Sequence, residues 1–256
     1  MTISFGIECE VAGGTSAMLD ALGLDGLHGY HCDCERCEPE RSSPDWTAQE
    51  DCTADGEFIS RILTYGDDGD RAIGQLAAAL KSARAVHSNG QGLHVHVDTS
   101  DMTPTTWVYF WRLWFRYQDE VGMLASGSYN DVRSYNQEVR FSQVVGTHEP
   151  GVTPDFWTAD PVLVAPRIGQ PYDRATWVNP RTGHGTAEFR LWNATRVEWR
   201  IHLAAGVSTA LIRAALDGVT VTKHDERTLF DIVSPYLSDK STAAYIRATI
   251  HQERAA

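Results

Sequence analysis

Four short segments of the chain place acids, histidines and an arginine at alternate positions, and this spacing constrains the fold more than any other feature. Successive side chains of an extended strand point to opposite faces of a sheet, so in each segment the apolar residues share one face and the charged residues share the other. The pattern predicts strands with a hydrophobic core on one face and a polar site on the other. The segments are Phe5-Gly6-Ile7-Glu8-Cys9-Glu10, Gly56-Glu57-Phe58-Ile59-Ser60, Gly92-Leu93-His94-Val95-His96-Val97-Asp98 and Thr186-Ala187-Glu188-Phe189-Arg190-Leu191.

Polar residues in the middle of these strands favour an antiparallel sheet with one open face. In a parallel α/β sheet both faces are covered and ligands bind at the strand ends. The segment between residues 150 and 180 contains Pro and Gly and is expected to hold short extended pieces at 162–164 and 176–178. We therefore expect an α+β fold, with a mainly antiparallel sheet, helices on one face and the site on the other. Helical spacing predicts helices at about residues 16–22, 68–86, from 103 onward, 196–216 and near the C-terminus.

Composition narrows the class of protein. With 256 residues, of which 42% are hydrophobic, the chain can bury one large core, and we expect a single domain over residues 1–256. The net charge of -12 argues against nucleic acid or an anionic membrane as a partner. The sequence contains neither a signal peptide nor a long apolar run, and its five cysteines suit a reducing compartment. We therefore expect a cytoplasmic protein, of a state of assembly that the sequence does not reveal.

The acids on the polar faces can supply the ligands that Mg²⁺ prefers. This ion binds hard oxygen ligands in an octahedron and keeps several waters, so a protein contributes a few carboxylates. Glu8, Glu10, Glu57 and Glu188 are the candidates. Alternate residues of a strand lie about 6.6 Å apart, so Glu8 and Glu10 can reach one ion or two neighbouring ions. The alternative is a pair of acids on the solvated face of an edge strand.

The histidines of the third segment admit three interpretations. His94 and His96 can be metal ligands, partners for phosphate, or ordinary polar residues of a half-exposed strand. Gly92 permits close backbone approach to a ligand, and Asp98 adds a third titratable group on the same face. These neighbours favour a functional site.

Two arginines are candidates for phosphate or substrate contacts. Glu188 and Arg190 could form an ion pair of little energetic value on a strand surface. A guanidinium also offers a phosphoryl group two parallel hydrogen bonds and stabilises the charge that develops during its transfer. Arg133 lies in a polar stretch, residues 126–136, that is typical of a long loop where substrate contacts are common.

The order of these motifs resembles that of the amidoligase family, a branch of the carboxylate-amine ligases that includes glutamine synthetase and glutamate-cysteine ligase. The similarity spans Phe5 to Arg190 and consists of F-G-x-E-x-E, an acidic turn followed by E-x-x-S, then G-L-H-V-H-V-D and T-x-E-F-R. It implies a curved glutamine-synthetase-like sheet that binds ATP with Mg²⁺ or Mn²⁺. The chain departs from the family where a Cys/His-rich insert follows the first strand.

The resemblance also implies roles for single residues. The implied reaction phosphorylates a carboxylate with ATP, after which an amine attacks the acyl phosphate and an amide, ADP and phosphate leave. Neither the small-molecule or peptide carboxylate nor the amine can be identified from the sequence. The implied metal ligands are Glu8, Glu10, Glu57, His94 and Glu188, while His96 lies on the nucleotide side and Arg190 holds the transferring phosphate.

Two other functions stay open. The first is a metal-dependent hydrolase that uses His94 and His96, in which Arg190 would have no obvious role. The second is a non-enzymatic, zinc-stabilised binding module whose acidic sheet face recognises a cationic partner.

A second metal motif lies in the insert at about residues 25–50. Tetrahedral zinc held by three thiolates and an imidazole would tie down a loop that is too polar to build its own core. The C-x-C step is tight and a second C-x-x-C is missing, so a metal-free exposed loop is the alternative. The candidate ligands are Cys32, Cys34 and Cys37 with His28, His31 or, further on, Cys52.

The insert is predicted to hold about one structural zinc ion per chain. Elemental analysis of protein purified without added metal measures this directly. Replacing two thiolates in a Cys34→Ser/Cys37→Ser variant should remove the zinc and lower the melting temperature. Protein without zinc, together with unchanged melting of the double variant, would show that the insert is metal-free.

Overall fold

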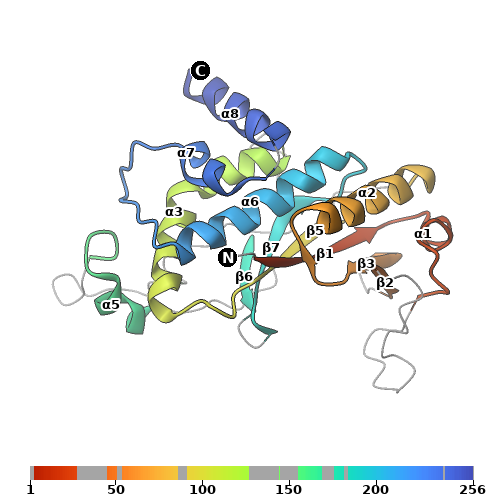
Figure 1. Cartoon of the computed structure of the whole chain (residues 1–256), viewed down its shortest axis with the longest axis horizontal. Coiled ribbons are helices and arrows are strands. Elements are labelled where there is room, and N and C mark those ends of the chain that lie inside the picture. The colour runs from red at the N-terminus through yellow and green to blue at the C-terminus, as the bar shows by residue number, and fades with distance from the viewer. Residues whose placement is uncertain are drawn as a thin grey trace.

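A computed structural model of the chain describes residues 3–27, 45–50, 54–85, 91–126, 144, 155–168, 176–181, 184–238 and 240–255. Its arrangement is drawn in Figure 1. The strands are β1 (Ser4–Val11), β2 (Trp46–Gln49), β3 (Gly56–Ser60), β4 (Leu63–Thr64), β5 (Gly92–Asp98), β6 (Val178–Arg181) and β7 (Thr186–Asn193). The helices are α1 (Thr15–Leu22), α2 (Asp67–Ser82), α3 (Pro104–Ser126), α5 (Pro161–Val164), η2 (Ala165–Arg167), α6 (Glu198–Leu216), α7 (Leu229–Val233), η4 (Ser234–Tyr236) and α8 (Lys240–Ala255).

The strands form one open, seven-stranded sheet in the order β2-β3-β1-β5-β7-β6, with β4 paired to β1. The paired strands of this sheet run antiparallel, as the sequence predicted. Pairing places the polar residues of four separate segments in direct register across the middle of the sheet. The aligned pairs are Glu10 with Glu57, Glu8 with His94 and His96 with Glu188.

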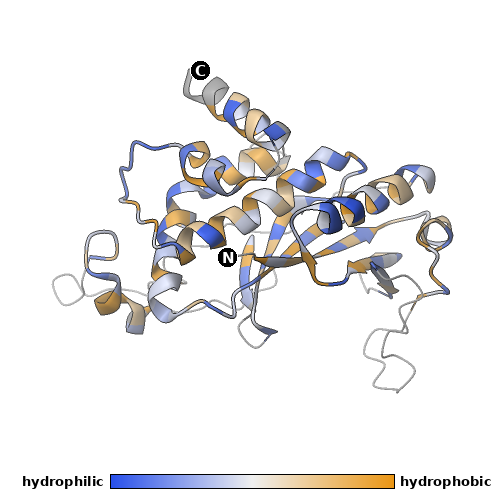
Figure 2. Ribbon diagram, in the orientation of Figure 1, coloured by the Kyte–Doolittle hydropathy of each residue, from blue (hydrophilic) through white to orange (hydrophobic). Residues whose placement is uncertain are grey.

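Helices cover the apolar face of the sheet. α2 and α6 lie along it, α3 crosses beside β7, and α7 and α8 form a further layer outside α6 (Figure 1). α6 is buried almost all round because it packs on β1 and β5 on one side and on α7 and α8 on the other. The hydropathy colours alternate along the central strands (Figure 2). The predicted alternation and the α+β class are therefore confirmed, with the helices on one face.

The predicted helices are present, with ends that differ by a few residues, but one predicted extended piece is wrong. Residues 162–164 belong to the short helix α5. Asp160 caps this helix by accepting a hydrogen bond from the Val162 backbone N–H at 2.9 Å, and Pro161 fits the first helical position. The other piece, residues 176–178, leads into β6. None of the helices in the described ranges is long and apolar enough to cross a membrane.

A bulge in β7 changes which face its last residues point to. β5 and β7 pair Val95 with Phe189 but Leu93 with Trp192, so the register shifts by one residue between these pairs. Strict alternation would place Trp192 on the polar face beside Glu188. The extra residue turns the side chains that follow it to the opposite face of the sheet. The Trp192 indole therefore donates to the Ser208 hydroxyl of α6 at 3.0 Å.

The edge strand β6 is held from two sides. A Cβ atom on Gly122 of α3 would lie 2.9 Å from the Trp177 indole, so only glycine allows this close contact. The Trp177 carbonyl also accepts a hydrogen bond from the Arg190 backbone N–H at 2.8 Å. The start of β6 is thereby fixed between α3 and β7.

A buried aspartate joins β2 to the β3–α2 region. The Asp45 carboxylate accepts hydrogen bonds from Arg61 at 2.9 Å and from Arg71 at 3.0 and 3.2 Å. Hydrogen bonds from Arg71 outweigh desolvation of the buried carboxylate and, with those from Arg61, lower the pKa of Asp45 below its usual value. Asp68 accepts from the same two arginines.

Replacing Asp45 by Asn should destabilise the fold by about 1–3 kcal/mol, because two charge-assisted contacts to a buried group are lost. Since the pKa is lowered on folding, this contribution is fully present above the unfolded pKa of about 3.9 and is lost as the pH falls through the folded value. Urea unfolding of both proteins between neutral and acidic pH measures the difference. The control is Asp67→Asn, which replaces an exposed carboxylate of α2. Equal stability of Asp45→Asn and wild type at neutral pH would contradict the prediction.

Candidate metal and phosphate site

The polar face of the sheet gathers carboxylates that are almost completely withdrawn from water. Glu188 is 0% exposed, Glu10 5%, Glu57 6% and His94 1%. Glu188, Glu57 and His94 lie on β7, β3 and β5. Glu10 lies on β1, which it shares with Glu8. Isolated carboxylates are costly to bury, so groups of like charge at this depth need a compensating cation.

His94 connects the carboxylates into two groups. Its Nδ1 lies 3.3 Å from Glu8 Oε2 and 3.8 Å from Glu188 Oε1. On the other side of the ring, Nε2 lies 3.6 Å from Glu10 Oε1. Within each group the ligand atoms lie within 4.8 Å of one another. The groups are Glu8, His94 and Glu188, and Glu10, Glu57 and His94.

The tautomer of the His94 ring decides which of the two groups can use its imidazole as a ligand. A neutral imidazole has one lone pair and one N–H, so it ligates one ion only. An ion at Nδ1 would replace the hydrogen bond between this nitrogen and Glu8, so that Glu8 and Glu188 complete one position and the Nε2–H points toward Glu10. Carboxylate oxygens and one imidazole are a donor set that suits Mg²⁺ or Mn²⁺, and the residues therefore fit a divalent cation.

The acids of the second group are oriented by neighbouring hydrogen-bond donors. Glu10 Oε2 accepts from the Gly92 backbone N–H at 2.7 Å, which leaves Oε1 facing His94. Glu57 Oε2 accepts from the Gln49 side-chain amide on β2. Both carboxylates are thus fixed before any ligand arrives.

Glu188 is held from both sides. Its Oε1 accepts from the Arg190 guanidinium, and its Oε2 accepts from the Asn179 side-chain amide of β6 at 3.3 Å. Burial alone would raise the pKa of Glu188, but the positive charge of Arg190 and the neighbouring histidines keep it below the usual value. The carboxylate is therefore ionised at neutral pH.

Glu8 is likewise kept ionised. Burial acts to raise its pKa, yet hydrogen bonds from His94 and His96 hold it well below its usual range. His96 Nε2 lies 3.1 Å from Glu8 Oε1 and 3.8 Å from Glu188 Oε1. Among the described residues, the four acids face one guanidinium and two imidazoles, so this part of the site carries an excess of negative charge.

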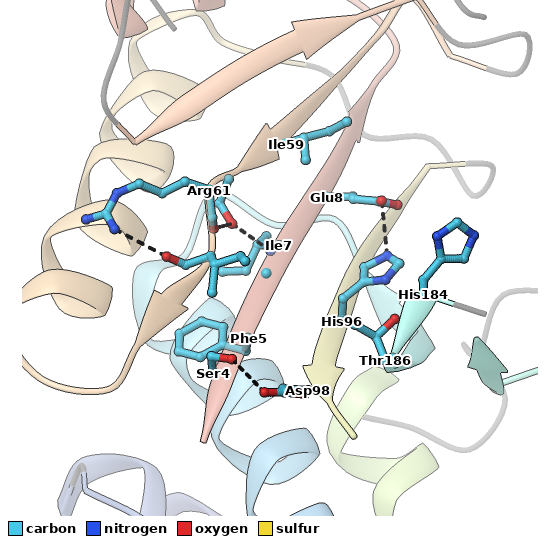
Figure 3. A pocket seen from close by; sticks show the side chains of 14 residues that line it. Ser4, Phe5, Ile7, Glu8, Ile59, Arg61, His96, Asp98, His184 and Thr186 are labelled. Atoms are coloured by element: carbon cyan, nitrogen blue, oxygen red, sulfur yellow. Dashed lines mark hydrogen bonds and ion pairs between the residues drawn. The ribbon is translucent and has the colours of Figure 1, made fainter. Parts of the chain in front are cut away.

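A cavity of about 320 Å³ opens beside Glu8 and continues along β1 and β5 to Asp98. Asp98 accepts from Ser4 at 3.2 Å and from the Ser100 backbone N–H. Figure 3 shows His96 and His184 at one wall of this cavity and the Ile59 side chain toward the other, while the Arg61 guanidinium extends away from it. The cavity thus joins an acidic end at Glu8 to a partly apolar wall.

Most of the sequence-predicted site residues meet here. The structure brings together Glu8, Glu10, Glu57, His94, His96, Glu188 and Arg190. Arg133 lies outside the described residues, as do the candidate zinc ligands His31, Cys32, Cys34 and Cys37.

Sequence reasoning missed three side chains that contact or extend this site, namely Gln49, Asn179 and His184. For Asn179 a signal was available, because Val178 and Pro180 flank it with the alternation of an edge strand and a Gly-containing turn follows. Gln49 and His184 have no comparable local signal.

No protein-family model matches the chain, and no curated protein matches it either.

Replacing Glu10 by Gln should remove the part of the stabilisation by Mg²⁺ or Mn²⁺ that comes from the ion held by Glu10 and Glu57. Gln keeps the shape and an acceptor for the Gly92 N–H but lacks the charge that a cation requires. A bound cation stabilises by about 2.7 kcal/mol at 100 times its Kd, which melting curves with and without metal detect. Asp20→Asn, on an exposed face of α1, controls for loss of one negative charge. An equal metal-dependent shift in Glu10→Gln and wild type would contradict the assignment.

Proposed function

We propose that the protein is an ATP- and Mg²⁺-dependent carboxylate-amine ligase that forms an amide bond through an acyl phosphate. The observation that carries the proposal is the convergence of buried carboxylates, one shared imidazole and one guanidinium on the open face of an antiparallel sheet. Such a site is suited to holding two anionic reactants together. The same arrangement supports a glutamine-synthetase-like sheet as the finer description of the fold.

The resident cations would be held by the two groups around His94. Glu8, His94 and Glu188 would bind one ion, and Glu10 and Glu57 would bind the other. When bound, Mg²⁺ neutralises the phosphate oxygens and the charge that develops on them.

The chain itself positions the reactants. His96 lies between the metal ligands and the cavity that continues to Asp98, so we assign the nucleotide to this side. The cavity volume of about 320 Å³ lies within the range of small-molecule sites. Arg190 would donate parallel hydrogen bonds to the transferring phosphoryl group and then to the acyl phosphate, holding it while the amine attacks the carbonyl carbon and phosphate leaves.

The other two functions explain less of the site. A hydrolase that uses His94 and His96 leaves Arg190 beside Glu188 without a task. A module that binds a cationic partner would gain nothing from burying Glu188 completely, because the partner must reach the acids that it recognises. We therefore retain the ligase.

Incubation with Mg-ATP, a panel of amino acids and short peptides, and an amine should release ADP and phosphate. With a carboxylate labelled with ¹⁸O, one labelled oxygen should pass to the released phosphate, because the carboxylate oxygen attacks the γ-phosphorus and leaves with it. Mass spectrometry of the phosphate measures this transfer. AMP and pyrophosphate would indicate adenylation instead, and amide hydrolysis without ATP would indicate the hydrolase.

Arg190→Lys should lower kcat by about 100-fold or more with a smaller change in ATP affinity, since Lys keeps the charge but loses the planar pair of donors. Steady-state ADP release and nucleotide titration separate the two effects. Arg196→Lys, at an exposed position beyond β7, is the matched control. Turnover at the wild-type rate would place Arg190 in a purely structural ion pair with Glu188.

A further inference from the structure

A buried asparagine on the edge strand is the feature that the proposed reaction leaves unexplained. Asn179 lies in β6 directly opposite Glu188 of β7 and is 0% exposed. Its position is rigid, because the start of β6 is fixed between α3 and β7 through Trp177.

The Asn179 amide holds one oxygen of the Glu188 carboxylate, and Arg190 holds the other. Its Nδ2 lies 3.3 Å from Glu188 Oε2, and an ionised carboxylate only accepts hydrogen bonds, so the NH₂ group must face it. This contact occupies Oε2 on the side away from the histidines. Glu188 Oε1, which accepts from the Arg190 guanidinium, lies 3.8 Å from both His94 Nδ1 and His96 Nε2, where a ligand oxygen is needed.

The same amide is a poor choice for stability. Its Oδ1 is buried and has no hydrogen-bond partner among the residues that the structure describes. An unmet buried acceptor costs free energy, and such groups in a folded protein call for a specific reason. An apolar residue of similar size would fill the space without that cost. What an asparagine supplies at this position is therefore the N–H donor to Glu188.

We infer that Asn179 is a positioning residue for the cation bound by Glu8, His94 and Glu188. It fixes the Glu188 carboxylate by a hydrogen bond to Oε2, so that Oε1, which Arg190 also holds, faces the ion. The inference rests on the metal site of the proposed function but not on the reaction carried out there. Residues that orient metal ligands in this way typically change metal affinity by about 10–100-fold when they are replaced.

Mn²⁺ binding tests the inference without any turnover. Free Mn²⁺ is counted by its EPR signal during titration of wild type, Asn179→Leu and Ser208→Ala, and melting is recorded in EDTA. Ser208 is a matched control because it is a buried residue that accepts a hydrogen bond from β7, on the helix-covered side of the sheet. For Asn179→Leu we expect the Kd for Mn²⁺ to rise about 10–100-fold, together with a lower melting temperature in EDTA because Glu188 Oε2 loses its donor. For Ser208→Ala we expect a lower melting temperature with an unchanged Kd.

The outcomes separate the two proposals. If wild type binds Mn²⁺ and Asn179→Leu binds it equally well, Asn179 does not position Glu188, whatever the reaction. If Asn179→Leu loses stability as Ser208→Ala does and keeps its Kd, Asn179 is a structural residue. If wild type itself binds no Mn²⁺, the metal site of the proposed function fails, and the inference fails with it. Should Asn179→Leu not fold, Asn179→Ala is judged by the same ratio of Kd values.

Discussion

Negative charge buried on one face of the sheet is the constraint on which the rest of the structure depends. Glu10, Glu57 and Glu188 are almost inaccessible to water, and among the described residues the guanidinium of Arg190 forms an ion pair with Glu188. Removing carboxylates from water costs several kcal/mol each, even after the protein has relaxed around them. The large apolar core on the other face of the same strands must offset that cost. The same strands thus carry the apolar core on one face and the polar site on the other.

The site is rigid because its side chains stand on paired strands and each is held by a neighbour. Gly92 holds Glu10, Gln49 holds Glu57, and Arg190 and Asn179 hold Glu188. Ligands that are already oriented lose little entropy when a cation or a phosphate binds. The antiparallel ladder brings these residues together from segments as far apart as β1 and β7.

The sequence predicted what depends on local periodicity and missed what depends on pairing. Alternation of polar and apolar residues identified the strands and the face that Glu8, His94 and Glu188 share, because that period is a property of a single strand. The β7 bulge and the contact between Asn179 and Glu188 depend on register, which involves residues distant in sequence. The helix at residues 162–164 was misread because a short apolar run suits either structure, and the Asp160-Pro161 start signal decides it. The predicted irregular insert at about residues 25–50 is wrong at its end, because Trp46–Gln49 pair with β3 as β2. The roles of Arg133 and of the candidate zinc ligands stay predictions, since these residues lie outside the described ranges.

The shared imidazole makes the two candidate cation positions chemically unequal. His94 can give its lone pair to only one of them, so one position would have a nitrogen ligand and the other oxygen ligands alone. First-row transition metals favour imidazole, whereas Mg²⁺ favours oxygen. In a mixture of divalent ions the two positions would therefore fill with different metals. The occupancy of each position would then depend on the supply of the ion that it favours. A preparation loaded with one metal need not represent the protein in the cell.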